Sequence, residues 1–164
     1  MKDKKEIDKK YKGFRYLVLG LTMGHRCGYV EIPKGHKLYG LSYSEQLPIT
    51  FKEISKQKIG KRGIVPIFCA GPLKEEDRIC MDLLFDVHGG ITFSGELRDF
   101  KGYWIGFDCA HSGDAKDFSL MGEKEKEIWK DFSIRDFGEV IRTTDYVEKE
   151  CKSLINQIIK YFKP

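Results

Sequence analysis

The sequence lacks a long apolar segment and any paired cysteine motif, and both absences narrow what the protein can be. No apolar run approaches the roughly 20 residues that a membrane-spanning helix needs, and the N-terminal stretch MKDKKEIDKKYKG has no apolar core of a signal peptide. The five cysteines are scattered and never form a Cys-x-x-Cys pair, which argues against a disulfide framework or a structural zinc ribbon. These absences predict a cytoplasmic protein without a membrane segment.

The motifs of several common enzyme classes are also missing. The chain has no Walker loop, no dinucleotide-binding G-x-G-x-x-G fingerprint and no G-x-S-x-G elbow. This excludes the usual nucleotide hydrolase, dehydrogenase and esterase interpretations. The zinc-binding patterns H-x-H, H-x-x-x-H and H-E-x-x-H are absent as well, so the sequence offers only a weak metal signal.

The 164 residues suffice for one domain that buries roughly 70% of its unfolded surface. The net charge is +4, and the lysine excess is concentrated in residues 1–12, which hold six lysines and three acidic residues. Such a segment predicts a solvated, mobile N-terminal arm. No nucleic-acid motif or interleaved aromatic pattern accompanies the basic residues, which argues against nucleic-acid binding. Monomer and homo-oligomer both stay open.

Hydrophobic periodicity predicts an α+β fold. A helical pattern of apolar residues covers 145–162, with Thr144 or Asp145 as its N-cap, and residues 33–48 are rich in turn formers and predict a loop. We therefore expect a single domain, mainly an antiparallel sheet with the long C-terminal helix packed on one face. The predicted strands are 14–21, 27–32, 64–70, 77–88, 91–97 and 103–108, and the predicted short helices are 49–58 and 123–132.

Strand alternation then assigns side chains to the two faces of the sheet. In the predicted strand 77–88, Asp86 and His88 share one face, and a three-residue turn through Gly89 and Gly90 keeps polar residues together across the next strand. The apolar rows would lie under the C-terminal helix. The uncovered polar face would carry Asp86, His88, Thr92, Ser94, Trp104 and Asp108, with His111 and Asp114 in the following loop.

Each of the four histidines lies within two residues of a glycine. Glycine lets the backbone turn sharply and lets a ligand approach main-chain N–H groups. Three of these corners, at His25, His88 and His111, could meet at one rim of the sheet, whereas His36 is assigned to loop packing. The candidate ligand-binding residues are His25, Arg26, Asp86, His88, Gly89, Gly90, Ser94, Trp104, Asp108, His111 and Asp114.

Two chemistries fit these residue types. In the first, the polar face binds a small phosphorylated or nucleotide-like molecule, with backbone N–H groups, histidines and Arg26 on phosphate, and Tyr29, Tyr39, Tyr43 or Trp104 stacked on a base. This interpretation needs no cofactor. In the second, a divalent metal such as Zn²⁺ or Mn²⁺ activates water for hydrolysis of a phosphodiester or ester. Its ligands would be Asp86, His88, Asp108 and His111.

Four segments resemble the sequence blocks of a small family of bacteriophage and bacterial proteins. They are GHRCGYVEIPKGHKLYG, DVHGGITFSG, YWIGFDCAHSGD and DYVEKECKSLINQI. The family has no established activity, so the resemblance assigns no catalytic residues. It implies that these blocks belong together and that the protein is phage-encoded and works in the host cytoplasm.

The first functional hypothesis is a small-ligand-binding protein. Because small phage proteins often counter host defence, one form of this hypothesis is an anti-defence protein that sequesters a nucleotide immune signal. The metal-dependent hydrolase is the second. The third is a protein-interaction module in which the basic N-terminal arm or the segment around Trp129 docks a host protein.

Overall fold

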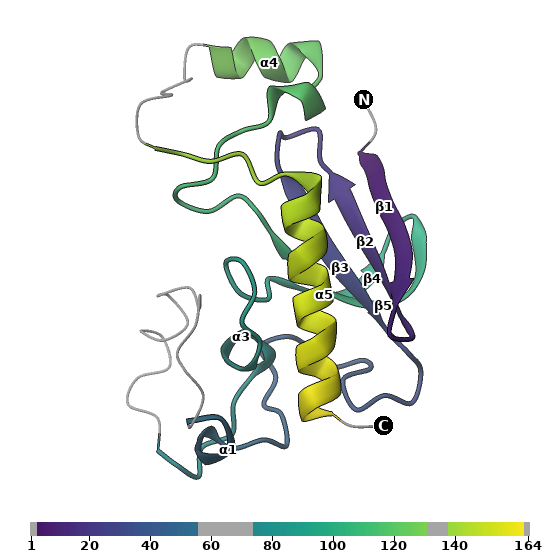
Figure 1. Ribbon diagram of the computed structural model, residues 1–164, viewed down its shortest axis with the longest axis vertical. Helices are drawn as coiled ribbons and strands as arrows, with labels where there is room; N and C mark the ends of the chain where they lie inside the picture. Colours follow the sequence, from purple (N-terminus) through teal and green to yellow (C-terminus); the bar gives the residue numbers. More distant parts are fainter. Residues whose placement is uncertain (1–2, 56–73, 131–137, 163–164) are drawn as a thin grey trace.

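The computed structural model describes residues 3–55, 74–130 and 138–162, and it is built around one five-stranded antiparallel sheet (Figure 1). The strands lie in the order β1-β2-β3-β5-β4. Four of the predicted strands are confirmed, with boundaries that differ by one to three residues. The strands are β1 Lys4–Tyr11, β2 Phe14–Gly20, β3 Arg26–Ile32, β4 Phe93–Leu97 and β5 Phe100–Asp108.

The basic N-terminal segment is part of the sheet, so the prediction of a mobile arm is wrong. β1 pairs with β2, and its one strongly apolar side chain, Ile7, packs into the core on the side of the C-terminal helix. On the other side Asp8 accepts a hydrogen bond of 2.8 Å from Arg15 Nε. The lysines of β1 then lie along an edge strand, where charge discourages pairing with another chain.

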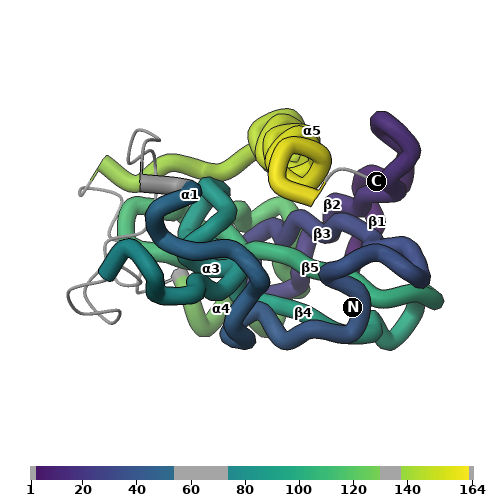
Figure 2. Tube along the Cα trace, turned by 90° about the horizontal axis from the view of Figure 1, so that it is seen from below, coloured from purple at the N-terminus to yellow at the C-terminus, as the bar shows by residue number. Residues whose placement is uncertain are grey.

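The helix α5, Thr144–Tyr161, lies along one face of the sheet as predicted (Figures 1 and 2). The fold is therefore α+β. Thr143 is the N-cap in place of the predicted Thr144 or Asp145, and its side chain accepts a hydrogen bond from the Tyr146 N–H. The apolar side of α5 packs on residues of β2, β3 and β5, and each large side chain buried there contributes about 1.5–3 kcal/mol. The buried apolar residues of α5 are Val147, Cys151, Leu154, Ile155 and Ile158.

The predicted strand 77–88 does not form. Its centre is the one-turn helix α3, Met81–Leu84, whose adjacent Leu83 and Leu84 are both buried. Burial of two neighbours is incompatible with the period of two on which the prediction rests. The segment then runs beside α5, where the Asp86 N–H and carbonyl are both bound by the Gln157 amide at 2.8 Å. The predicted three-residue hairpin turn is wrong for the same reason.

On the face away from α5, the hairpin of β4 and β5 curls back over the sheet (Figure 2). Leu97 and Phe100 of the hairpin pack in one cluster with Leu17 and Leu19 of β2, although two strands separate β2 from β4. A flat sheet would hold these strands roughly 14 Å apart. Gly95 and Gly102 sit in the hairpin with φ of 148° and 116°, and a bulge lies between Gly95 and Leu97. These features allow the strong bend.

The remaining described elements are short. They are α1 Phe51–Ser55, within the predicted helix 49–58, the 3₁₀ turn η1 Phe118–Leu120, and α4 Glu123–Lys130, within the predicted helix 123–132. The predicted strand 64–70 lies outside the described residues. Within the described ranges, no helix has both the length and the apolar character that a membrane crossing requires.

Candidate functional site

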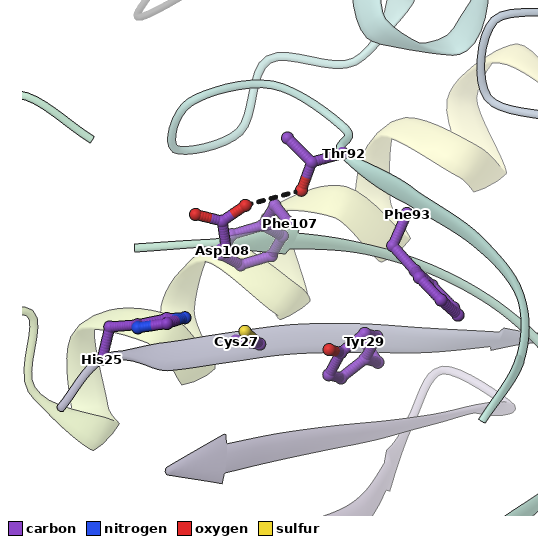
Figure 3. Close-up of a pocket in the computed structure, with 7 residues that line it drawn as sticks. All are labelled: His25, Cys27, Tyr29, Thr92, Phe93, Phe107 and Asp108. Carbon is purple, nitrogen blue, oxygen red and sulfur yellow. Dashed lines mark hydrogen bonds between the residues drawn. The ribbon is translucent and has the colours of Figure 1, made fainter. Parts of the chain in front are cut away.

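A pocket of about 370 Å³ opens on the face of the sheet away from α5 (Figure 3). Three neighbouring parts of the fold form it. The start of β3 supplies one wall, the start of β4 a second, and the end of β5 the third. The lining residues are His25, Cys27, Tyr29, Thr92, Phe93, Phe107 and Asp108.

Strand register explains how these residues meet. Cys27 of β3 lies opposite Asp108 of β5, and Phe93 of β4 lies opposite Gly106 of β5. Because Gly106 has no side chain, the Tyr29 ring occupies the space where a Cβ atom would be, and it meets the Phe93 ring edge-on at a centroid distance of 5.5 Å. The absence of one side chain therefore creates the aromatic wall of the pocket.

Among the described residues that line this pocket, Asp108 is the only acidic one. Its Oδ2 atom accepts a hydrogen bond of 2.9 Å from the Thr92 hydroxyl, and its Oδ1 atom accepts one of 3.1 Å from the Ala110 N–H. The His111 Nε2 atom lies 3.6 Å from Oδ1, too far for a hydrogen bond. The side chain is 29% exposed, so its oxygens remain accessible to a ligand.

The His25 ring points into the same pocket (Figure 3). Its Nδ1 atom is buried and has no hydrogen-bond partner. Burial lowers the pKa of His25, and the nearby positive charge of Lys116 lowers it further. The imidazole is therefore neutral at pH 7, and it can both donate and accept a hydrogen bond.

Cys27 lies in the floor of the pocket but is a poor nucleophile. Burial raises the pKa of its thiol to about 12, against the smaller opposing effect of a hydrogen bond with Tyr29. Burial also raises the pKa of the Tyr29 phenol, followed by the effect of Cys27. Both groups are thus protonated at pH 7, and the thiolate needed for covalent chemistry is not formed.

A second polar cluster lies on the other side of β5, against the beginning of α5. Asp114 is its centre, with a side chain only 2% exposed. It accepts hydrogen bonds of 2.7 Å from His88 Nε2 and from Arg142 Nε, and one of 3.0 Å from the His111 N–H. His88 Nδ1 lies 3.1 Å from the Tyr146 hydroxyl. We call these residues the Asp114 network.

The Asp114 carboxylate and the Arg142 guanidinium form an ion pair within this network, with Arg142 Nε 2.7 Å from Asp114 Oδ1. Burial would raise the pKa of Asp114, but hydrogen bonds from Arg142 and His88 hold it below its ordinary value. The hydrogen bond between Arg142 and Asp114 also raises the pKa of Arg142. Through these hydrogen bonds the network fastens the loop after β5 to the beginning of α5.

The structure brings together only part of the predicted site. His25 and Asp108 line the pocket, and His111 lies beside them. The His111 ring also packs on Gly89, whose position leaves no room for a Cβ atom, and it lies 5.5 Å from the His88 ring. Gly89 and Gly90 have φ of 68° and 88°, which favours glycine at both positions. The chain therefore turns at these two residues, but the turn does not join two strands as predicted.

His88 and Asp114 belong to the Asp114 network and do not line the pocket. Four more predicted side chains lie outside both places, so the prediction of a single polar face is wrong. Asp86 is bound to α5 through its backbone. Trp104 shares the face of Asp108, as alternation predicts, but it is fully buried under the β4–β5 hairpin. The Ser94 hydroxyl accepts a hydrogen bond from the Tyr43 N–H and ties the 33–48 loop to β4.

Arg26 is the fourth, and it is a structural residue. Its guanidinium is buried and hydrogen-bonds Glu6, Asp117 and the Arg142 carbonyl. Burial alone would lower the pKa of Arg26, but the hydrogen bonds to Glu6 and Asp117 raise it. This guanidinium is therefore not available for a phosphate.

His36 does not line the pocket. Its Nδ1 atom accepts a hydrogen bond of 3.1 Å from the Leu38 N–H, and its ring lies between Phe14 and Phe162. The assignment of His36 to loop packing agrees with these contacts.

The proposed metal ligands do not form a metal centre. Among the described residues, no group of three or more His, Cys, Asp or Glu side chains is placed to hold a metal ion. Asp86 and His88 lie on the α5 side, and Asp108 lies on the other face. The ligand set predicted for the metal-dependent hydrolase is therefore wrong.

Sequence reasoning missed several residues that the structure makes important. Cys27, Phe93 and Phe107 read as core residues, and their place in the pocket depends on the curl of β4. Arg142 and Tyr146 lie far from Asp114 in the sequence, and no local pattern connects them. Thr92 was on the predicted polar face and Tyr29 was a candidate for stacking on a base, so a signal for these two was present.

No family model, curated protein or solved structure matches this chain. The resemblance to the phage family therefore stays a prediction, and the function is argued from the site.

Proposed function

We propose that this protein binds a small planar ligand of the nucleobase type in the pocket of His25 and Asp108. The observation that carries the proposal is that the His25 ring and the Asp108 carboxylate line one pocket, and that the Nδ1 atom of this ring has no hydrogen-bond partner among the described residues. A buried polar atom without a partner costs about 1–3 kcal/mol, so a group that satisfies it on binding gains that much. Such atoms call for an explanation, and a missing ligand is one.

The charge of the pocket limits the part of the ligand that enters it. Asp108 contributes a negative charge and His25 is neutral, so a phosphate would meet repulsion here. An amino or ring N–H group would instead donate to Asp108. A nucleobase combines such donors with acceptors for His25 on one rigid edge.

The walls and the size support the same class of ligand. Tyr29 and Phe93 offer aromatic surface, and stacking of a base on an aromatic side chain is worth about 1–3 kcal/mol. A volume of about 370 Å³ is within the range of small-molecule sites. Neither wall residue supplies a charge that would restrict binding to one base.

The test is calorimetric titration with adenosine, guanosine, cytidine and uridine. We expect at least one to bind, and Asp108→Asn to weaken that binding at least tenfold, because a hydrogen bond to a charged group contributes about 1.5–3 kcal/mol. Asp145→Asn, an exposed carboxylate on α5, is the matched control and should bind as the native chain does. If none of the four nucleosides binds at millimolar concentration, the proposal is wrong.

A second measurement separates a binder from an enzyme. The protein is incubated with the nucleoside that binds and with its 5′-monophosphate, then denatured, and the released compounds are identified by mass spectrometry. We expect them back intact. Holding a ligand unchanged is what sequestration of a nucleotide signal requires, whereas an altered compound would make the protein an enzyme.

A further inference from the structure

We propose that a second pocket, next to the first, holds the phosphate of the ligand, so that the natural ligand is a nucleotide. This inference rests on the proposed function. The second pocket has a volume of about 820 Å³ and lies between the tip of the β4–β5 hairpin and the ends of β1 and β2. It is lined by Asp3, Lys5, Leu19, Leu21, Thr22, Tyr29, Leu97, Arg98, Asp99 and Phe100.

Tyr29 belongs to both pockets. The two cavities therefore adjoin on one face of the sheet, with the Tyr29 side chain at their junction. A base bound in the smaller pocket would direct its attached sugar past Tyr29 into the larger one. Leu19, Leu97 and Phe100 give that pocket an apolar floor, on which the carbon face of a sugar can pack.

The charged residues that line the larger pocket are two cations, Lys5 and Arg98, and two carboxylates, Asp3 and Asp99, so a phosphate site depends on which of them are already engaged. Asp3 already accepts a hydrogen bond of 3.1 Å from the Thr22 N–H, and Asp99 also has an interaction partner. Arg98 forms no ion pair within 4 Å with any described residue. Lys5 is paired with Asp8 at 3.3 Å, with the lysine side chain 54% exposed, and exposed pairs of this kind contribute about 0–1 kcal/mol.

Lys5 of β1 and Arg98 of the hairpin turn both line the pocket. Lys5 Nζ lies 6.0 Å from the centre of the Phe100 ring, two residues from Arg98. A phosphate between them would gain a point charge from Lys5 and a two-pronged donor from Arg98. The first pocket holds the carboxylate that selects the base, and the second holds the cations that select the phosphate.

The test compares each of the four nucleosides with its 5′-monophosphate by calorimetric titration. We expect the monophosphate of the preferred base to bind at least tenfold more tightly than the nucleoside in 50 mM salt. This advantage should shrink in 500 mM salt, because the contact is exposed. The double variant Lys5→Gln with Arg98→Gln should lose the advantage and keep the affinity for the nucleoside. Lys12→Gln is the control for loss of one lysine charge outside the pocket, because the Lys12 Nζ atom donates a hydrogen bond to Asn156 of α5.

The outcomes separate the two proposals. If the nucleoside binds and its monophosphate binds no better, or if the double variant retains the advantage, the phosphate site is refuted while the base pocket stands. If no nucleoside binds, the second pocket is tested by titration with inorganic phosphate alone, and binding is followed through the NMR amide shifts of residues 97–100. Saturable shifts that the double variant lacks would support the phosphate site, and their absence would refute it.

Discussion

Asp108 is the last residue of β5 and Asp114 lies in the loop that follows it, but their side chains lie on opposite sides of the sheet. Asp114 is almost fully buried beside α5 and accepts hydrogen bonds from His88 and Arg142. Asp108 is partly exposed in the pocket, and its one side-chain donor is Thr92. The hydrogen-bond partners of Asp114 compensate for its burial, whereas the Asp108 carboxylate retains accessible lone pairs.

The histidines differ in the same way. Both ring nitrogens of His88 have partners, while the Nδ1 atom of His25 and the Nε2 atoms of His36 and His111 are buried without one among the described residues. Of these three rings, that of His25 lines the pocket and that of His111 lies beside it. Fully partnered polar groups hold a structure together, and unpartnered ones are tolerated where a ligand completes them. The comparison assigns stability to the Asp114 network and ligand binding to the pocket, and it can be tested at both places.

The largest expected effect comes from removal of the buried carboxylate. We expect Asp114→Ala to lower the free energy of unfolding by about 3–5 kcal/mol, because it leaves Arg142 and His88 without their shared partner. Asp108→Ala should cost no more than about 1 kcal/mol, since its main donors can turn to water. Urea unfolding followed by Trp fluorescence measures both. Equal losses would mean that the two carboxylates do not differ in role.

The next effect concerns the packing of His111 on Gly89. Gly89 and Gly113 both have positive φ, of 68° and 89°, so alanine at either position carries a backbone penalty of about 1–2 kcal/mol. At Gly113 a Cβ atom would meet nothing within 4 Å, but at Gly89 it would collide with the His111 ring. We therefore expect Gly89→Ala to destabilise the protein more than Gly113→Ala in the same urea assay, and to weaken nucleoside binding. Identical values would show that the ring moves away freely.

A smaller effect should appear with pH. Hydrogen bonds from Arg142 and His88 hold the pKa of Asp114 below its ordinary value of 3.8, against the effect of burial. A folded-state pKa below the unfolded one stabilises the protein above that unfolded value, and this stability is lost as pH falls through the folded pKa. We expect the free energy of unfolding to fall as the pH is lowered below about 4, and Asp114→Asn to flatten that decline. An unchanged slope in the variant would exclude Asp114 as its source.

The sequence predicted the elements whose side chains obey one clear period. The strand 103–108 and the C-terminal helix have such periods, and alternation placed Trp104 and Asp108 on one face correctly. The strands at 14–21 and 27–32 are instead short apolar segments, which were predicted from composition and the turn residues between them. β1 was missed because its lysines obscure the single anchoring residue Ile7, whose burial depends on distant strands. Charge pattern alone cannot reveal an edge strand that the rest of the sheet supports.

The candidate site was predicted only in part, and one wrong strand explains much of the error. Asp86 and His88 were assigned to the uncovered face, but docking of this segment on Gln157 of α5 places them on the other side. The pocket itself depends on the curl of the β4–β5 hairpin, which no local pattern encodes. His25 and Asp108 were found because a polar residue beside glycine or in an apolar strand is conspicuous without any tertiary information.

The smallest expected effect on stability is at His25, and it tests the comparison most directly. His25→Leu removes a buried nitrogen that has no partner, so the free energy of unfolding should change by no more than about 0.5 kcal/mol, or rise. His88→Leu removes the contacts to Asp114 and Tyr146 and should cost about 1–3 kcal/mol. Nucleoside affinity should show the reverse order, with the larger loss in His25→Leu. Urea unfolding and calorimetric titration of the two variants measure both quantities. A clear loss of stability in His25→Leu would indicate that the His25 ring supports the fold, as the residues of the Asp114 network do.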